Sequence, residues 1–221
     1  MRHSLRPRLY RQARSGCMST VRTLARQERS EFADLLASLA PQQWGMASLC
    51  SGWTVRDVVA HTVAYLDQSR TGLMIEMLRH RWDVDRVNAK LLETFADQTP
   101  EQLVGLMRRG VEPSGAGALY GGRVALIECL IHQQDVRRPL GRLRAIPRDR
   151  LRVSLSYARI SPVIGGARRT HGVRLEATDI DWSAGSGPAV CGAGEALLLA
   201  MTGRHSTVIG ELEGPGVRLL G

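Results

Sequence analysis

Apolar residues recur every three or four positions along most of the first 140 residues, which is the period of amphipathic helices. The first of these segments spans about residues 18–39, and a loop over 40–52 follows it. Further helical segments are predicted to start near Thr54 and to cover 85–109 and 123–137. Four amphipathic helices joined in this way predict an antiparallel four-helix bundle.

The start of the second helix carries specific local signals. Thr54 can act as the N-cap, and Asp57, three residues later, as its acidic partner in a variant of the capping box. Trp53 and Val58 occupy the two positions of a hydrophobic staple, so we assign Trp53 to the staple rather than to ligand binding. From this start the apolar period predicts a helix that continues to about His80.

Proline and glycine limit the later helices. Pro100 lies inside the third segment, so this segment is expected to be one broken helix or two helices. A Gly-rich loop precedes the fourth helix, and Pro139 with Gly141 ends it.

The pattern of apolar and polar residues changes after Pro147. The elements predicted here are a helix over 148–160, a strand within 172–182, a turn and short strand within 185–190, a helix ending at Gly203 and a last strand over 216–220. We therefore predict a mainly α protein, with a helical bundle over 18–146 and a small α+β domain over 147–221.

The basic charge is concentrated at the N-terminus. The first 17 residues contain five arginines and no acid, and without them the net charge falls from +9 to +4. We predict that residues 1–17 form a basic, disordered extension, although an organellar transit segment or a true start at Met18 would give the same pattern. The sequence has no base-reading motif, and its aromatic content of 5% argues against a stacking surface for single-stranded nucleic acid.

The remaining composition describes an ordinary globular chain. No apolar run approaches the roughly 20 residues that a membrane helix needs, so no membrane partner is expected. The four cysteines, Cys17, Cys50, Cys129 and Cys191, are scattered and form no C-x-x-C pair. Reduced thiols in a cytoplasmic protein are the expectation.

Two polar residues interrupt the apolar face of the fourth helix. Glu128 and His132 are four residues apart and therefore stack one turn above the other, among Val124, Ile127 and Ile131. Burying an unpaired carboxylate is costly unless it is paired or binds a metal. His61 on the second helix can supply a third ligand, and two histidines with one carboxylate suit zinc with an open position for water or substrate.

Structural roles would also explain these residues. Glu128 can pair with Arg137, and His132 can be a hydrogen-bonded core histidine. Asp135, seven residues after Glu128, can orient a ligand histidine from behind or bridge to Arg138, and we favour the structural bridge. Residues without a suggestive partner are assigned surface, capping or packing roles: His3, His80, His171, His205, Cys50, Cys129 and Cys191.

Two strings identify a known family. "LCSGWTVRDVVAHTVAYL" and "ECLIHQQDVRRPLG" resemble the mycothiol-dependent maleylpyruvate isomerase family, a branch of the DinB-like bundles. The resemblance implies a DinB-like fold and a divalent metal held by His61, Glu128 and His132. The tail from Gly172 to Arg204 is similar to the small C-terminal domain of many members, so the resemblance covers Met18 to the end.

The resemblance also implies a chemistry. In this family the open metal position takes the thiolate of mycothiol, a small actinobacterial thiol, which adds to an activated double bond. Rotation and elimination give isomerisation, and without elimination the same step is thiol S-transfer. A dicarboxylate substrate would need arginines. The candidates are Arg81, Arg86, Arg123 and Arg137, although we expect each of them to lie on a solvated helix face.

Two other functions stay open at this stage. Metal-bound water would make the protein a hydrolase, and a metal-containing binding or regulatory protein would show no turnover. The expected partners are a small-molecule thiol and a small electrophile, with neither nucleic acid nor membrane. The expected assembly is a monomer or homodimer.

Overall fold

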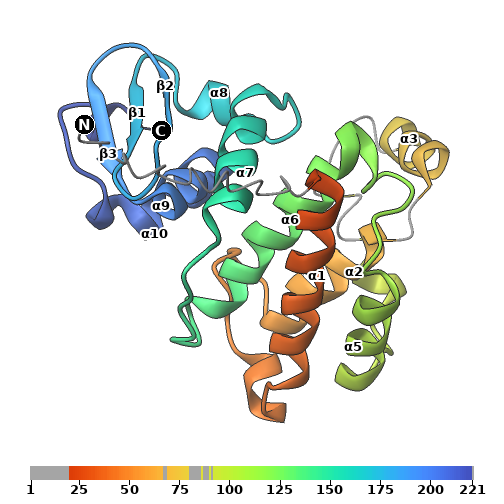
Figure 1. Cartoon of the computed structure of the whole chain (residues 1–221). Helices are drawn as coiled ribbons and strands as arrows, with labels where there is room; N and C mark the ends of the chain where they lie inside the picture. Colours follow the sequence, from red (N-terminus) through yellow and green to blue (C-terminus); the bar gives the residue numbers. More distant parts are fainter. Residues whose placement is uncertain (1–19, 67–68, 80–85, 87–89, 91, 221) are drawn as a thin grey trace, which may run out of the picture.

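Four helices pack in a ring in which each contacts two others, as the computed structural model shows for residues 20–66, 69–79, 86, 90 and 92–220 (Figure 1). They are α1 (Val21–Ala37), α2 (Val55–Leu66), α5 (Pro100–Arg109) and α6 (Leu119–Arg137). Their shared core is built from large apolar side chains, including Phe32, Leu36, Val59, Leu103 and Met107. The predicted bundle is confirmed; residues 1–17 lie outside the described residues.

The N-terminal signal of α2 has the predicted geometry, but the predicted end is wrong. The backbone N–H of Thr54 donates to Asp57 at 2.9 Å, and the N–H of Asp57 donates to the Thr54 hydroxyl at 3.2 Å. The helix ends at Leu66 instead of near His80, and α3 (Arg70–Arg79) begins after it. The Ser69 hydroxyl accepts the Gly72 N–H at 2.9 Å, so Ser69 caps a new helix start, which the apolar period does not reveal.

The third predicted helix is broken, as the proline indicated. Residues 95–97 form a turn, and α5 begins at Pro100, a position where its missing N–H costs nothing. Thr99 and Gln102 form a reciprocal capping box at this start.

The fourth helix is regular from Arg123, as predicted, but its entrance is unusual. Tyr120, Gly121 and Gly122 have left-handed backbone angles, with φ of 53°, 70° and 93°. A Cβ at Gly122 would lie 3.3 Å from the Cα of Arg22, so α6 enters the bundle in close contact with α1.

The C-terminal segment forms a small sheet covered by helices. Strands β1 (Arg174–Ala177), β2 (Ser183–Gly185) and β3 (Ala189–Gly192) lie in the order β2-β1-β3, with β1 antiparallel to β2 and parallel to β3. The helices are α7 (Arg148–Ile160), α8 (Gly166–Arg169), α9 (Gly194–Leu199) and α10 (His205–Val208). The predicted α+β character is confirmed.

The predicted last strand over 216–220 is wrong. Residues Val217–Leu219 form a 3-10 turn, and the residue that pairs with β3 is Glu213, opposite Cys191. Gly214, with φ of 105°, turns the chain, and within 216–220 the Gly216 N–H donates to the Ala189 carbonyl of β3 at 2.9 Å.

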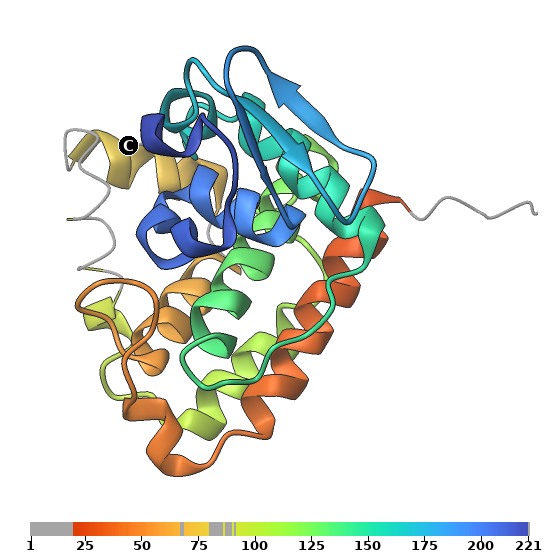
Figure 2. The ribbon, with the colours of Figure 1, turned by 90° about the vertical axis from the view of Figure 1, so that its left-hand side faces the viewer.

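The two parts of the chain share a core along α6. Ile127, Leu130 and Ile131 of α6 pack in one cluster with residues of α7, the sheet and α9, and Figure 2 shows α6 next to these elements. A domain boundary near 146 stays a prediction. Among the described residues, no helix is both long and apolar enough to span a membrane.

Candidate metal centre

The three side chains proposed as metal ligands converge, although they come from two helices. His61 lies on α2, and Glu128 and His132 lie on α6. One ligand atom from each residue lies within 4.8 Å of the other two, and the two imidazole rings are 4.9 Å apart, centroid to centroid. The packing of α2 against α6 therefore brings together residues that are 67 or more positions apart in the sequence.

His132 is fixed at both ring nitrogens. Its Nδ1 lies 2.9 Å from Asp135 Oδ2, and its Nε2 lies 3.3 Å from Glu128 Oε2. Two ligands that each stand about 2 Å from a tetrahedral zinc ion are roughly 3.3 Å apart. The Nε2–Oε2 pair already has that separation.

His61 is buried, and its Nδ1 has no hydrogen-bond partner among the described residues. The ring contacts Trp53 and Tyr65 edge-on, with centroid distances of 5.2 and 4.9 Å. Burying a nitrogen without a hydrogen-bond partner costs free energy, which indicates that this imidazole is available to bind a ligand.

A second set of potential ligands, Cys50, His132 and Asp135, lies on the other side of His132. Here Arg204 already supplies the positive charge: its Nη2 lies 2.6 Å from Asp135 Oδ2 and 3.3 Å from Cys50 Sγ. A cation would be repelled by this guanidinium, so the set with His61 is the better metal candidate.

The protonation states of His61 and Glu128 suit a cation on the His61 side. Burial lowers the pKa of His61 to about 3, and the nearby His132 adds to this effect, so His61 is neutral with a free lone pair. Burial acts to raise the pKa of Glu128, but the hydrogen bond with His132 and the positive charges around the carboxylate together outweigh it and lower that pKa. Burial likewise acts to lower the pKa of His132, but the hydrogen bonds with Asp135, Cys50 and Glu128 raise it well above its usual range.

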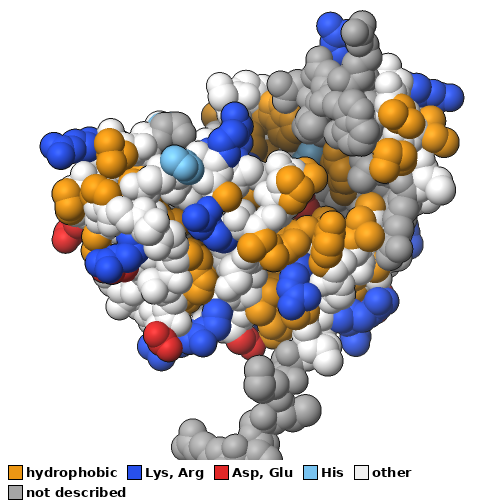
Figure 3. Space-filling model, turned by 90° about the horizontal axis from the view of Figure 1, so that it is seen from above, with side chains coloured by type: hydrophobic (Ala, Val, Ile, Leu, Met, Phe, Trp, Pro, Cys, Tyr) orange, Lys and Arg blue, Asp and Glu red, His pale blue; other side chains and the backbone are white. Residues whose placement is uncertain are grey.

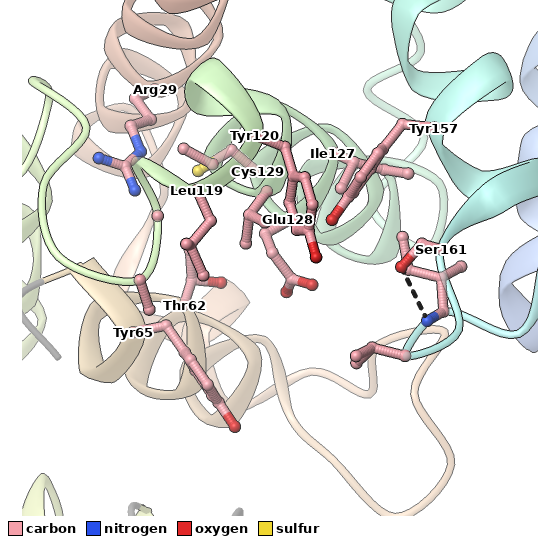
Figure 4. A pocket seen from close by; sticks show the side chains of 16 residues that line it. Arg29, Thr62, Tyr65, Leu119, Tyr120, Ile127, Glu128, Cys129, Tyr157 and Ser161 are labelled. Atoms are coloured by element: carbon pink, nitrogen blue, oxygen red, sulfur yellow. Dashed lines mark hydrogen bonds between the residues drawn. The ribbon is translucent and has the colours of Figure 1, made fainter. Parts of the chain in front are cut away.

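A cavity of about 220 Å³ opens beside Glu128. Figure 4 shows the Glu128 carboxylate pointing toward the open centre, with Tyr120 and Tyr157 on one side and Tyr65 on the other. Most of the lining is apolar, and a neighbouring hollow of about 360 Å³ shares Tyr120, Tyr157 and Ser161 with it. Seen from above, the molecule is hollowed, with hydrophobic side chains around the hollow and an acidic and a histidine side chain visible in it (Figure 3).

The structure places the other residues named from the sequence elsewhere. Glu128 does not pair with Arg137, which donates to Gln133 and the Arg142 carbonyl. Asp135 does not bridge to Arg138 as we favoured; it binds Arg204, because Arg138 is held by Glu195 and Glu211.

The remaining polar candidates are mostly peripheral. Arg86 is exposed, and Arg123 donates to the Tyr120 carbonyl at the neighbouring hollow. Cys129 is 1% exposed, and burial raises the pKa of its thiol to about 11, which fits an inert packed cysteine. His171 is exposed. Four residues considered from the sequence lie outside the described residues: His3, Cys17, His80 and Arg81.

Three residues at the site gave no usable signal in the sequence: Arg29, Cys50 and Arg204. Arg29 lines the cavity, and Cys50 and Arg204 contact Asp135. Cys50 lies within the string that carries the family resemblance, but nothing in its spacing relates it to Asp135 or Arg204.

Comparisons with known proteins agree with this fold. Residues 25–76 match the family model described as the mycothiol maleylpyruvate isomerase N-terminal domain. Two similar crystal structures are those of the mycothiol-dependent maleylpyruvate isomerase and of its histidine-to-alanine variant, with TM-scores of 0.53 and 0.57. Each is 16% identical to this chain, and each alignment covers 88% of this chain and 91% of the other.

No curated protein sequence matches the chain significantly. The crystal structures, at this low identity, establish the fold. The resemblance to the mycothiol-dependent maleylpyruvate isomerase family inferred from the sequence is confirmed over residues 25–76, which include the first of the two strings.

Proposed function

Taking this family resemblance as the premise, we propose that the protein is a divalent-metal-dependent enzyme that uses mycothiol to isomerise, or to transfer a thiol to, a small electrophile. The metal, zinc by preference, is held by His61, Glu128 and His132. The observation that carries the proposal is the convergence of these three ligand atoms within 4.8 Å of one another beside a cavity.

The residues present fit a divalent cation. Two imidazole nitrogens and one carboxylate oxygen are a common donor set for catalytic zinc, and three protein ligands leave a position for a cosubstrate. The unpartnered Nδ1 and the low pKa of His61 support this assignment, because a neutral imidazole has a lone pair to give. Asp135 holds the far nitrogen of His132, as residues behind metal-binding histidines commonly do.

A bound divalent cation lowers the pKa of a thiol and so supplies a strong nucleophile at neutral pH. The protein's part is to orient that sulfur next to the cavity, whose apolar lining keeps bulk water away from the electrophile. Addition of the thiolate to a conjugated double bond leaves a single bond that can rotate. Elimination of the same thiolate then restores the double bond in the other geometry, and protonation of the adduct instead gives the S-conjugate.

Metal content tests the site directly. The purified wild-type protein is expected to hold about one zinc per chain by inductively coupled plasma mass spectrometry, and His61→Ala and His132→Ala are each expected to lose most of it. His171→Ala is the matched control, because His171 is exposed and lies outside the cluster. Equal metal content in all four proteins would refute the assigned ligands.

The dependence of turnover on added thiol distinguishes three functions: a thiol-dependent enzyme, a hydrolase and a binding protein. The proposal expects turnover of an activated alkene only with added mycothiol, together with thiol binding that disappears in His61→Ala. Hydrolysis that ignores added thiol would establish a hydrolase instead, and metal binding without any turnover would indicate a binding protein.

A further inference from the structure

Arg29 on α1 is a buried cation without an acidic partner. It is 2% exposed, and its Nη1 donates to the Gly110 carbonyl at 2.7 Å. Within the described part of the chain, no aspartate or glutamate forms an ion pair with it, and the adjacent Glu28 is bound by Arg144 and Arg150 instead. A buried charge is costly unless it is paired, so this guanidinium needs a counter-charge that the described residues do not supply.

This guanidinium lines the cavity beside Glu128. The neutral thiol of Cys129, another lining residue, is within hydrogen-bonding reach of it. The Arg29 Nε is enclosed and has no hydrogen-bond partner among the described residues. Nη2 lies next to Gly117, where a Cβ would come within 2.9 Å of it, and glycine at this position therefore leaves room for the guanidinium.

The other residues that line the cavity favour a ligand with an apolar body. Among the described residues that line it, Arg29 is the only lysine or arginine and Glu128 the only acid. The other walls are mainly aliphatic and aromatic side chains, among them Leu119, Ile127, Tyr157, Val163 and Ile164. A pocket with one cation and apolar walls suits a ligand with one negative group.

We propose that this cavity binds a monocarboxylate with an apolar body, whose carboxylate pairs with Arg29. The identification of this ligand with the electrophilic cosubstrate rests on the proposed function, whereas the binding site itself does not. Of the arginines considered from the sequence for a dicarboxylate, Arg86, Arg123 and Arg137 are not among the described residues that line this cavity. The site therefore favours an acid with a single charge over a dicarboxylate.

Calorimetric titration with a matched pair of ligands tests the proposal. Full-length protein, both as purified and after treatment with a chelator, is titrated with 3-phenylpropionate and with its uncharged analogue 3-phenylpropanamide. The carboxylate is expected to bind at least about tenfold more tightly than the amide, since charge-assisted hydrogen bonds are roughly twice as strong as neutral ones. The preference is expected to persist after chelation.

Variants then locate the charge. Arg29→Met is expected to remove the preference for the carboxylate and leave amide binding unchanged. Arg26→Met is the control on the same helix, because Arg26 is exposed and pairs with Glu112 at 3.0 Å. Gly117→Ala retains Arg29 but crowds its Nη2, so it is expected to weaken the preference even if Arg29→Met does not fold; circular dichroism checks folding of each variant.

Three results would overturn the proposal: no binding of the carboxylate, equal affinity for acid and amide, or an unchanged preference in folded Arg29→Met or Gly117→Ala. Loss of carboxylate binding on chelation would place the ligand on the metal and would also overturn it. If the protein as purified holds no metal but still shows Arg29-dependent binding, the proposed function fails and this site stands.

Discussion

At the scale of single residues, Asp135 is the polar centre of the site. It is fully buried and contacts His132, Arg204 and Cys50 at once. Burial acts to raise its pKa, but the hydrogen bond with His132 and the charge of Arg204 lower it to about 2. The carboxylate is therefore ionised at neutral pH and fixes the orientation of the His132 ring.

Replacing this carboxylate is expected to weaken metal binding without removing a ligand. For Asp135→Asn we expect zinc affinity to fall by about 10- to 100-fold, the usual effect of losing a partner behind a metal-binding histidine. Competition with a chromogenic chelator measures the affinity. Asp181→Asn, at a fully exposed side chain, is the control, and equal affinities in the two variants would contradict the role of Asp135.

Gly122 tests the strained entrance to α6. Its φ of 93° and the closeness of Arg22 mean that Gly122→Ala adds both backbone strain and a steric contact. We expect a loss of about 1–3 kcal/mol in the free energy of unfolding, measured by urea denaturation. Gly45→Ala is the matched control, since a Cβ there meets nothing within 4 Å; similar values for both would argue against strain.

At the scale of elements, a buried ion-pair network joins α1 to α7. Glu28 of α1 is fully buried; it accepts hydrogen bonds from Arg150 at 2.9 Å and from Gln133 at 3.0 Å, and it contacts Arg144. Arg150 also donates to Glu31 at 2.7 Å. Breaking one partner of such a network leaves a buried charge with less compensation.

Arg150→Met is therefore expected to lower the free energy of unfolding at pH 7 by about 3 kcal/mol. The hydrogen bond from Arg150 lowers the pKa of Glu31 from its ordinary 4.5, so the Arg150–Glu31 contribution is present above that pH and lost as the pH falls below it. The difference from wild type is thus expected to shrink in acid denaturation series. Arg152→Met, whose exposed side chain lies 3.7 Å from Asp181, should change stability by less than about 0.5 kcal/mol.

At the scale of the whole molecule, a metal at the candidate centre would link α2 to α6. A ligand that binds only the folded state adds about 2.7 kcal/mol at 100 times its Kd. For a chain of this size, we expect zinc to raise the melting temperature by roughly 5–10 °C relative to chelator-treated protein. His61→Ala should show no such shift in differential scanning fluorimetry; an equal shift in that variant would place the zinc elsewhere.

The sequence determined the features that depend on near neighbours. Helical period, the Thr54–Asp57 cap and the stacking of Glu128 over His132 involve residues at most four positions apart, so spacing alone specifies them. The same locality explains the errors. A helix restart at Ser69 and the turn at Gly214 replaced a predicted helix and a predicted strand, because each is a local exception within a continuing apolar pattern.

Only the tertiary structure decided which distant residues share the site. His61 meets Glu128 and His132 because α2 packs on α6, and Arg204 reaches Asp135 from a segment 69 residues later in the chain. Arg29 comes to the cavity wall from α1, and nothing in its own neighbourhood along the chain marks it. The sequence pattern records which face of a helix is buried, but which side chains meet there depends on how the helices pack against one another.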